Sequence, residues 1–139
     1  MKGSLARSMS ILGLILITAA CGSSAMTDRL EATYAMADFE IEGAERSRTE
    51  FNGSTVVDGP RGISQRFTPL NGVEPEEVYE AAVAAAEADG WELRPSSLGG
   101  VVGDRRVAGA ESCDALTIND PFDGKVLVRL QESTCAPGL

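Results

Sequence analysis

One amphipathic helical pattern in the middle of the chain constrains the fold more than any other feature. It begins at Pro75, and proline suits the first turn of a helix because its missing N–H needs no partner there. Gly90 and Trp91 follow its end, as in a left-handed cap with an apolar contact back to the last turn. Its apolar residues recur at three- and four-residue spacing, as Val78, Tyr79, Ala82, Val83 and Ala86. The high alanine content predicts that this helix lies close against a sheet.

The segments before this helix alternate polar and apolar residues, as strands with one buried face do. Phe39 and Ile41 alternate with acidic residues, and Asn52-Gly53 is a typical hairpin turn because both positions of a type I′ turn need positive φ. The next expected strand places four residues on one face, namely Ile63, Gln65, Phe67 and Pro69.

The segments after the helix also alternate. We expect a strand to begin at residues 91–93, and we expect residues 99–103 to be a mobile glycine-rich loop, with Arg105-Arg106 in a solvated turn. Residues 114–132 read as a hairpin around the turn cluster 119–124, with one apolar face made of Leu116, Ile118, Val126, Val128 and Leu130. The predicted fold is therefore a two-layer α+β domain: an antiparallel sheet of about four to five strands with one main helix on one face.

The N-terminus has the order of an export signal. Lys2 and Arg7 are its only charges, and an uncharged apolar run over residues 11–20 ends in small residues before Cys21. The run is much shorter than the ~20 residues that span a bilayer core. The stretch 17–21, Ile-Thr-Ala-Ala-Cys, resembles the lipobox of bacterial lipoproteins, although an aliphatic residue is commoner at Thr18. The resemblance implies cleavage before Cys21 and a diacylglycerol on its thiol. The alternative is an ordinary secreted protein cleaved after Ala20 or Ala25.

This interpretation divides the chain into a signal peptide over residues 1–20, a lipidated tether over 21–36 and a single α+β domain over 37–139. Residues 27–37 form either part of the tether or a short helix with Leu30, Tyr34 and Ala37 on one side. The order of elements also resembles small secreted lipoproteins of the actinobacterial type, through Pro75-Glu76-Glu77, Gly90-Trp91 and the final hairpin. That resemblance implies no activity and no catalytic residue.

The net charge is −9, and it becomes −11 without residues 1–20, which hold two of the 12 basic residues and none of the 21 acidic ones. Such a chain repels nucleic acid and anionic lipid head groups, so a nucleic-acid partner is not expected. Membrane attachment is expected through the lipid on Cys21, at the extracytoplasmic face of the cell membrane. Two acyl chains hold a protein stably because each buried CH₂ contributes about 0.8 kcal/mol.

Three cysteines are present, and lipidation of Cys21 leaves Cys113 and Cys135 as a pair. An oxidising compartment then favours a disulfide between these two, which contributes about 3 kcal/mol on the chain-entropy account. The alternatives are two free thiols or a metal pair, but the chain contains no histidine and two thiolates alone make a poor zinc site.

The motif search predicts no catalytic residue, metal ligand or cofactor. Without histidine the Ser-His-Asp and Cys-His mechanisms are excluded, and Phe122 stands where a Ser-x-x-Lys motif ending at Lys125 needs serine. A calcium loop over the 119–130 region lacks ligands at Pro121 and Leu130. The helix dipole explains the four glutamates at the start of the helix, which are Glu74, Glu76, Glu77 and Glu80.

These observations favour a membrane-anchored binding or protein-interaction module of the cell envelope, whose partner is an envelope protein or a small ligand. Two alternatives stay open. One is an envelope enzyme acting through a carboxylate held at raised pKa in an apolar pocket. The other is a regulatory or inhibitory lipoprotein. An apolar concavity with converging polar groups is typical of a ligand site, whereas a flat apolar patch is typical of a protein interface.

Overall fold

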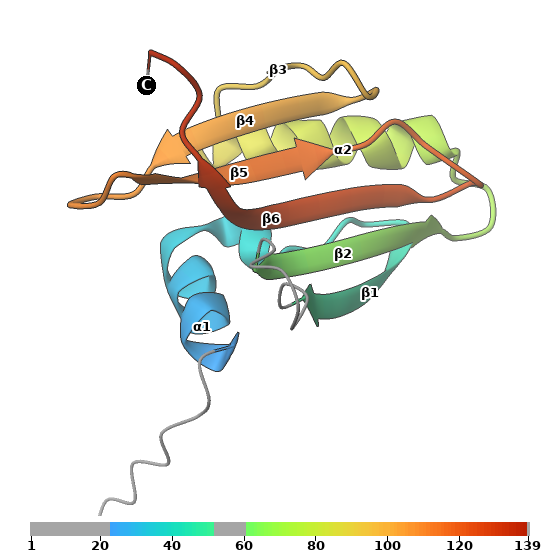
Figure 1. The fold of residues 1–139 in the computed structure, drawn as a ribbon. Helices are drawn as coiled ribbons and strands as arrows, with labels where there is room; N and C mark the ends of the chain where they lie inside the picture. Colours follow the sequence, from blue (N-terminus) through green and yellow to red (C-terminus); the bar gives the residue numbers. More distant parts are fainter. Residues whose placement is uncertain (1–22, 52–60, 139) are drawn as a thin grey trace, which may run out of the picture.

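The computed structural model describes residues 23–51 and 61–138 (Figure 1). The signal segment, Cys21 and the Asn52-Gly53 hairpin therefore lie outside the described residues. In chain order the elements are α1 (Ser23–Thr33), the 3₁₀ helix η1 (Ala35–Ala37), β1 (Ala44–Phe51), β2 (Gly62–Pro69), α2 (Pro75–Ala88), β3 (Arg94–Pro95), β4 (Val101–Arg106), β5 (Ser112–Ile118) and β6 (Val126–Thr134).

The strands form one sheet in the order β1-β2-β6-β5-β4-β3, and every neighbouring pair is antiparallel. The α+β class and the antiparallel sheet are confirmed. The expected strand number of four to five is wrong, because the sheet has six strands, and the expectation of one main helix is incomplete, because α1 is a second helix. Strand β4 was not expected: residues 99–103 do not form the mobile glycine-rich loop that their glycines indicated, because residues 101–103 belong to this strand.

Gly103 explains why a glycine-rich segment forms strand β4. It is buried, and a Cβ atom at this position would lie 3.2 Å from the Trp91 ring and 3.0 Å from the carbonyl oxygen of Glu92. The glycine therefore allows the chain leaving α2 to lie directly on β4, which is a known use of glycine inside a strand. The strand expected to begin at residues 91–93 is not formed there, and β3 begins only at Arg94.

Helix α2 ends as its sequence predicts. Gly90 has a φ of 84°, its N–H donates to the carbonyl of Glu87, and the N–H of Trp91 donates to the carbonyl of Ala86 at 3.0 Å. These two bonds define a Schellman motif, which turns the chain and buries Trp91. Val78, Ala82 and Ala86 form the buried stripe of the helix against the sheet.

The core lies between the helices and one face of the sheet. The strand register places Ile63, Leu130 and Leu116 in one row, with Gly103 beside them. The next row contains Gln65, Val128 and Ile118, so the predicted inward face of residues 63–67 is confirmed, glutamine included. Phe39 and Ile41 pack on this core from an irregular segment, and the strand expected for them is not formed.

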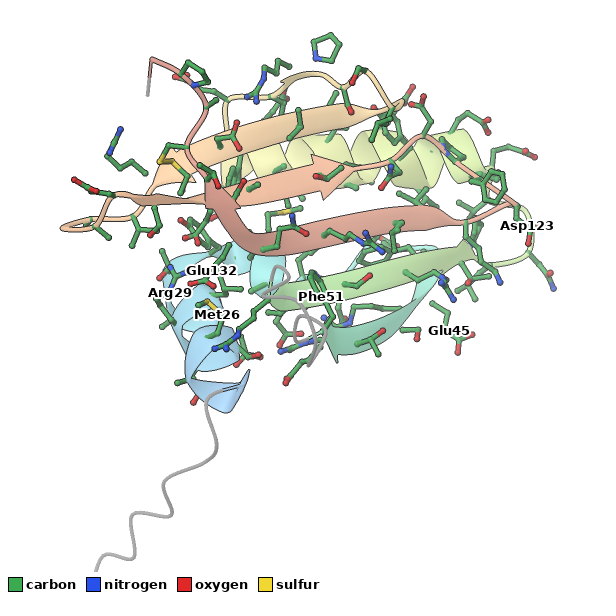
Figure 2. All side chains as sticks on the ribbon, in the orientation of Figure 1. Met26, Arg29, Glu45, Phe51, Asp123 and Glu132 are labelled. Carbon is green, nitrogen blue, oxygen red and sulfur yellow. A yellow bond between two sulfur atoms is a disulfide. The ribbon has the colours of Figure 1, made fainter. Side chains whose placement is uncertain are left out.

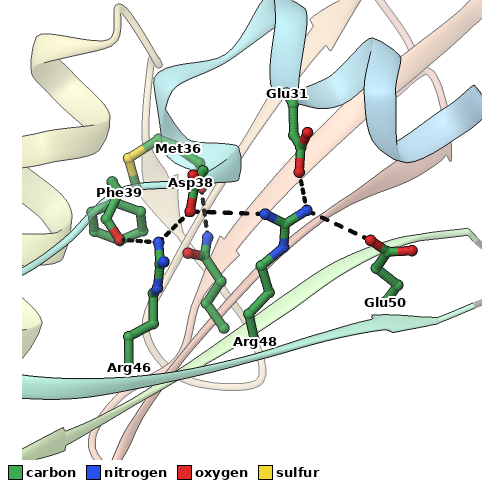
Figure 3. A network of polar contacts seen from close by, with 8 residues as sticks. Glu31, Met36, Asp38, Phe39, Arg46, Arg48 and Glu50 are labelled. Atoms are coloured by element: carbon green, nitrogen blue, oxygen red, sulfur yellow. Dashed lines mark hydrogen bonds and ion pairs between the residues drawn. The ribbon is translucent and has the colours of Figure 1, made fainter. Parts of the chain in front are cut away.

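Helix α1 and η1 close the end of the core that α2 leaves open. Leu30, Tyr34, Met36 and Ala37 are buried there, so the segment that the sequence left between helix and tether is helical through Thr33 and packed. Arg46 and Arg48 on β1 hold this segment from the side (Figure 3). The Arg46 guanidinium donates to the Asp38 carboxylate at 2.5 Å and to the Phe39 carbonyl at 2.9 Å, and Arg48 pairs with Glu31.

The predicted disulfide between Cys113 and Cys135 is present. Cys113 lies on β5, on the face opposite to the helices, and its sulfur is bonded to that of Cys135 just after β6. The bond ties the C-terminal end of the chain to the middle of the sheet.

Candidate functional site

One face of the sheet is packed by the helices, and no described helix covers the other face (Figure 1). Along β6 the residues on this open face are Leu127, Arg129 and Gln131, which alternate with buried residues of the core. The open face is therefore where side chains from distant parts of the chain can meet a partner.

A hollow of about 640 Å³ lies on this face beside the β5–β6 connection. Residues of β2, of β6 and of the connection 119–125 line it, together with Leu98 from the turn between β3 and β4. Its size falls within the roughly 300–1,000 Å³ of ordinary ligand sites. It lies at the end of the sheet away from α1, as the positions of Arg29 and Asp123 in Figure 2 indicate.

A tight turn positions two residues of the hollow. Asp123 and Gly124 both have positive φ, at 50° and 69°, as a type I′ turn requires. Phe122 and Lys125 flank it as a two-way hydrogen-bonded pair, with N–H to carbonyl distances of 2.9 and 3.0 Å. Phe122 is held in place by its backbone while its side chain is 84% exposed, which is unusual for phenylalanine.

A second turn brings Leu98 to the same hollow. The N–H of Ser96 donates to the carbonyl of Gly100 at 2.9 Å, and the N–H of Leu98 donates to the Ser96 hydroxyl at 3.2 Å. Gly100 has a φ of 78° and approaches the Ile118 carbonyl so closely that a side chain there would clash. The turn is thus pinned to the end of β5, and it presents Leu98 at 90% exposure.

Three cations surround Leu127 in the floor of the hollow. Lys125 and Arg129 stand two residues before and after Leu127 on the same chain, and Arg66 is its partner across the β2–β6 pair. Diagonal neighbours on one sheet face lie about 7–8 Å apart, so Arg66 is near both other cations. Within residues 23–51 and 61–138, none of the three forms an ion pair; the Arg129 guanidinium instead lies 5.8 Å from the centre of the Phe51 ring.

Other arginines of the domain are engaged with carboxylates or aromatic rings. Arg29 pairs with Asp114, Arg46 with Asp38, Arg48 with Glu31 and Arg94 with Asp104. Arg105 donates to the carbonyl of Asp89 and lies over the Trp91 and Tyr34 rings at 4.8 and 5.6 Å from their centres. The solvated turn expected for Arg105-Arg106 is therefore wrong, because both residues belong to β4 and the Arg105 side chain is packed against the core.

Two acidic residues, Asp120 and Asp123, also line the hollow, and among the described residues neither forms an ion pair with its cations. Asp120 leans toward Gly99, where an added Cβ would lie 3.0 Å from its Oδ2 atom. Burial, and next the charge of Asp120, raise the pKa of Tyr79 on α2 above its ordinary value. Asp123 occupies the tip of the turn (Figure 2).

A smaller hollow of about 320 Å³ lies at the opposite end of the sheet, beside Arg29, Tyr34 and Asp114. Asp114 is fully buried, and Arg29 donates to both of its oxygens at 2.6 and 2.8 Å. The Tyr34 hydroxyl also donates to Asp114, at 2.7 Å. Because both oxygens already accept these bonds, Asp114 fastens α1 to β5 and is not placed as a general acid or base.

The sequence identified some of these residues and missed others. It assigned Cys113 and Cys135 correctly, and Trp91 is core, as expected. Cys21 lies outside the described residues. The hollow was missed because Arg66, Lys125 and Arg129 are brought together only by the strand register; the available signal was that they occupy outward positions of alternating strands. The sequence did not identify Asp114 as buried. It lies on the same sheet face as Leu116, but a carboxylate is expected on that face only when α1 is known to supply its partners.

The fold and the hollow define an α+β domain that keeps one sheet face free for contact. Comparisons with protein-family models, with curated proteins and with solved structures found no match. Among the described residues, no group of three or more potential ligands lies close enough to hold a metal ion. In the same part of the chain, no helix has the length and hydrophobicity needed to cross a membrane.

Proposed function

We propose that this chain is a lipid-anchored protein of the cell envelope that binds another molecule in the hollow on its open sheet face. The observation that carries the proposal is the hollow itself: a concave site whose three cations form no ion pair with the described residues, with two strongly exposed apolar side chains, Phe122 and Leu98, at its edge. A soluble domain rarely exposes such residues together without a contact to make.

The start of the folded domain supports the anchored arrangement. Helix α1 begins at Ser23, two residues after Cys21, and it is fixed to the sheet through Leu30, Arg29 and Tyr34. A diacylglycerol on Cys21 would hold the domain close to the bilayer, because only one residue separates Cys21 from the start of α1. The hollow would then lie at the other end of the sheet, where a partner can reach it.

The anchor is tested by subcellular fractionation of the wild-type chain and of Cys21→Ala. We expect the wild type in the membrane fraction and the variant in the soluble extracytoplasmic fraction, because without residues 1–20 the chain has a net charge of −11 and is repelled by anionic lipid head groups. Intact mass measurement of the wild type should show a diacylated Cys21. Unchanged membrane retention of the variant would refute the anchor.

The binding role is tested by affinity recovery from detergent-solubilised membranes. Wild-type protein, Phe122→Ser and Leu70→Ser are compared; Leu70 is also an exposed apolar residue, at 52%, but it lies outside the hollow. We expect the same partner to be recovered with the wild type and with Leu70→Ser and to be lost with Phe122→Ser. Equal recovery with all three proteins would show that the hollow is not the binding site.

A further inference from the structure

We propose that the hollow accepts an acidic peptide segment of a protein partner, with two carboxylates close to an aromatic or aliphatic side chain. This inference rests on the proposed binding function and adds the chemical class of the ligand. It is carried by the cations around Leu127 and by the two apolar side chains at the edge of the same hollow.

The charge in the floor of the hollow runs against that of the whole chain. The protein has a net charge of −9, yet Arg66 lies diagonal to Lys125 on one side and to Arg129 on the other, and no carboxylate is bound to any of the three in the described part of the chain. Diagonal neighbours on a sheet face are within reach of each other when their side chains are long, so these like charges repel. An incoming anion relieves that repulsion. Because the Debye length is about 8 Å at physiological salt, the negative charges elsewhere on the domain are largely screened from the site.

The kind of cation points to carboxylates. Two of the three side chains are arginines, whose planar guanidinium donates two parallel hydrogen bonds to a carboxylate. The two arginines lie on adjacent strands, so their guanidinium groups are offset along the sheet. This arrangement suits two separate carboxylates better than one. Lys125, held by its backbone pair with Phe122, adds a point charge beside the aromatic ring.

The apolar edge requires more than a small anion. Phe122 and Leu98 are 84% and 90% exposed, although a turn fixes the backbone of each. A free phosphate or a single carboxylate would leave both side chains in water and fill little of the 640 Å³. An apolar side chain between two acidic residues would contact these two residues while its neighbours meet the cations.

An anionic bilayer fits the site less well than a peptide. The cations lie in the floor of a concave site, and the acidic Asp123 stands at the tip of the turn beside it. A flat lipid surface would meet this carboxylate as well as the cations, whereas a narrow chain segment can enter the hollow and avoid it.

The test is an NMR titration of the full-length, ¹⁵N-labelled protein in detergent with short blocked peptides. The probe is acetyl-Ala-Glu-Phe-Glu-Ala-amide, and its matched control has glutamine in place of both glutamates. We expect amide shifts at residues 122–129 with the acidic peptide, an affinity at least about tenfold above that of the neutral one, and weaker binding at higher salt.

Substitutions locate the effect. The double variant Arg66→Gln with Lys125→Gln should lower the affinity for the acidic peptide about tenfold or more and leave the neutral peptide unaffected. Arg94→Gln is the control, because it removes a positive charge from an ion pair with Asp104 outside the hollow. Unchanged spectra away from the substituted sites confirm that the variants are folded.

The outcomes separate this inference from the binding role. Equal shifts with both peptides, or binding to phosphatidylglycerol vesicles in place of the acidic peptide, would overturn the acidic-peptide class. Absence of peptide binding together with Phe122-dependent recovery of a membrane partner would overturn this inference alone. If neither is seen, the inference and the proposed function both fail.

Discussion

Asp114 is the residue on which the position of α1 depends most. Its carboxylate is fully buried on β5 and accepts hydrogen bonds from Arg29 and from Tyr34, both in the N-terminal segment. The bonds to Asp114 raise the pKa of the Arg29 guanidinium, so this side chain stays charged. A buried charge with its partner removed costs far more than a surface pair does.

Arg29→Met should therefore lower the free energy of unfolding by about 2–3 kcal/mol, because it leaves Asp114 buried with only the Tyr34 hydroxyl as partner. Arg46→Met is the matched control: its partner Asp38 is largely exposed, and we expect a loss below about 1 kcal/mol. Urea denaturation measures both. Equal losses would show that Asp114 does not hold α1.

Tyr34 makes the stability of the domain depend on pH in the alkaline range. Burial, and next the hydrogen bond to Asp114, raise its pKa above the ordinary value of about 10. As pH rises, the unfolded chain loses the Tyr34 proton before the folded chain does. The contribution of Tyr34 to the free energy of unfolding is therefore complete below pH 10 and is lost as pH rises above it. Tyr34→Phe should be less stable by about 1.5 kcal/mol at pH 7. The difference in unfolding free energy between the wild type and Tyr34→Phe should become smaller from pH 9 to pH 11. A difference that stays constant over this range would contradict the assigned pKa shift.

Helix α1 belongs to the folded domain, although its sequence hardly shows this. Few of its residues are apolar, and Leu30 is its one large buried aliphatic side chain among the described positions. Helix α2 was predictable because its apolar spacing, Pro75 and Gly90-Trp91 all agree. Strand β4 was not, because the reason for Gly103 is the Trp91 ring packed on it, a contact between segments that the local pattern does not contain.

Leu30→Ala tests the role of α1. If the helix is part of the core, the substitution should lower the free energy of unfolding by about 3 kcal/mol, as buried leucines do. Leu70→Ala, at a residue that is 52% exposed, should change it by less than about 1 kcal/mol. Thermal and urea denaturation provide the comparison. Similar small effects at both positions would mean that α1 adds little to the domain.

At the scale of the whole molecule, the disulfide and the hollow both depend on how distant segments are brought together. The face of Cys113 follows from local alternation alone: it is three residues from Leu116, so the two point to opposite faces of the sheet. The hollow needed the full strand order: Arg66 meets Leu127 only because β2 pairs with β6, and the intervening chain contains three other strands and α2. A sequence pattern carries no such information.

The disulfide should contribute about 3 kcal/mol, since it joins residues 22 apart and restricts the unfolded chain. Replacing Cys113 and Cys135 together with alanine should lower the unfolding free energy by that amount. Dithiothreitol should destabilise the wild type similarly and leave the double variant unaffected. Insensitivity of the wild type to the reductant would contradict the assigned contribution.

The most direct measurement of the central claim, that the hollow on the open sheet face is where this protein meets its partner, is photo-cross-linking in the native cell envelope. A photoreactive phenylalanine analogue is placed at position 122 or, as a control, at position 70. We predict one discrete adduct from position 122 that disappears when Arg66 and Lys125 are changed to glutamine, and none from position 70. No adduct at position 122, or the same adducts from both positions, would contradict the account.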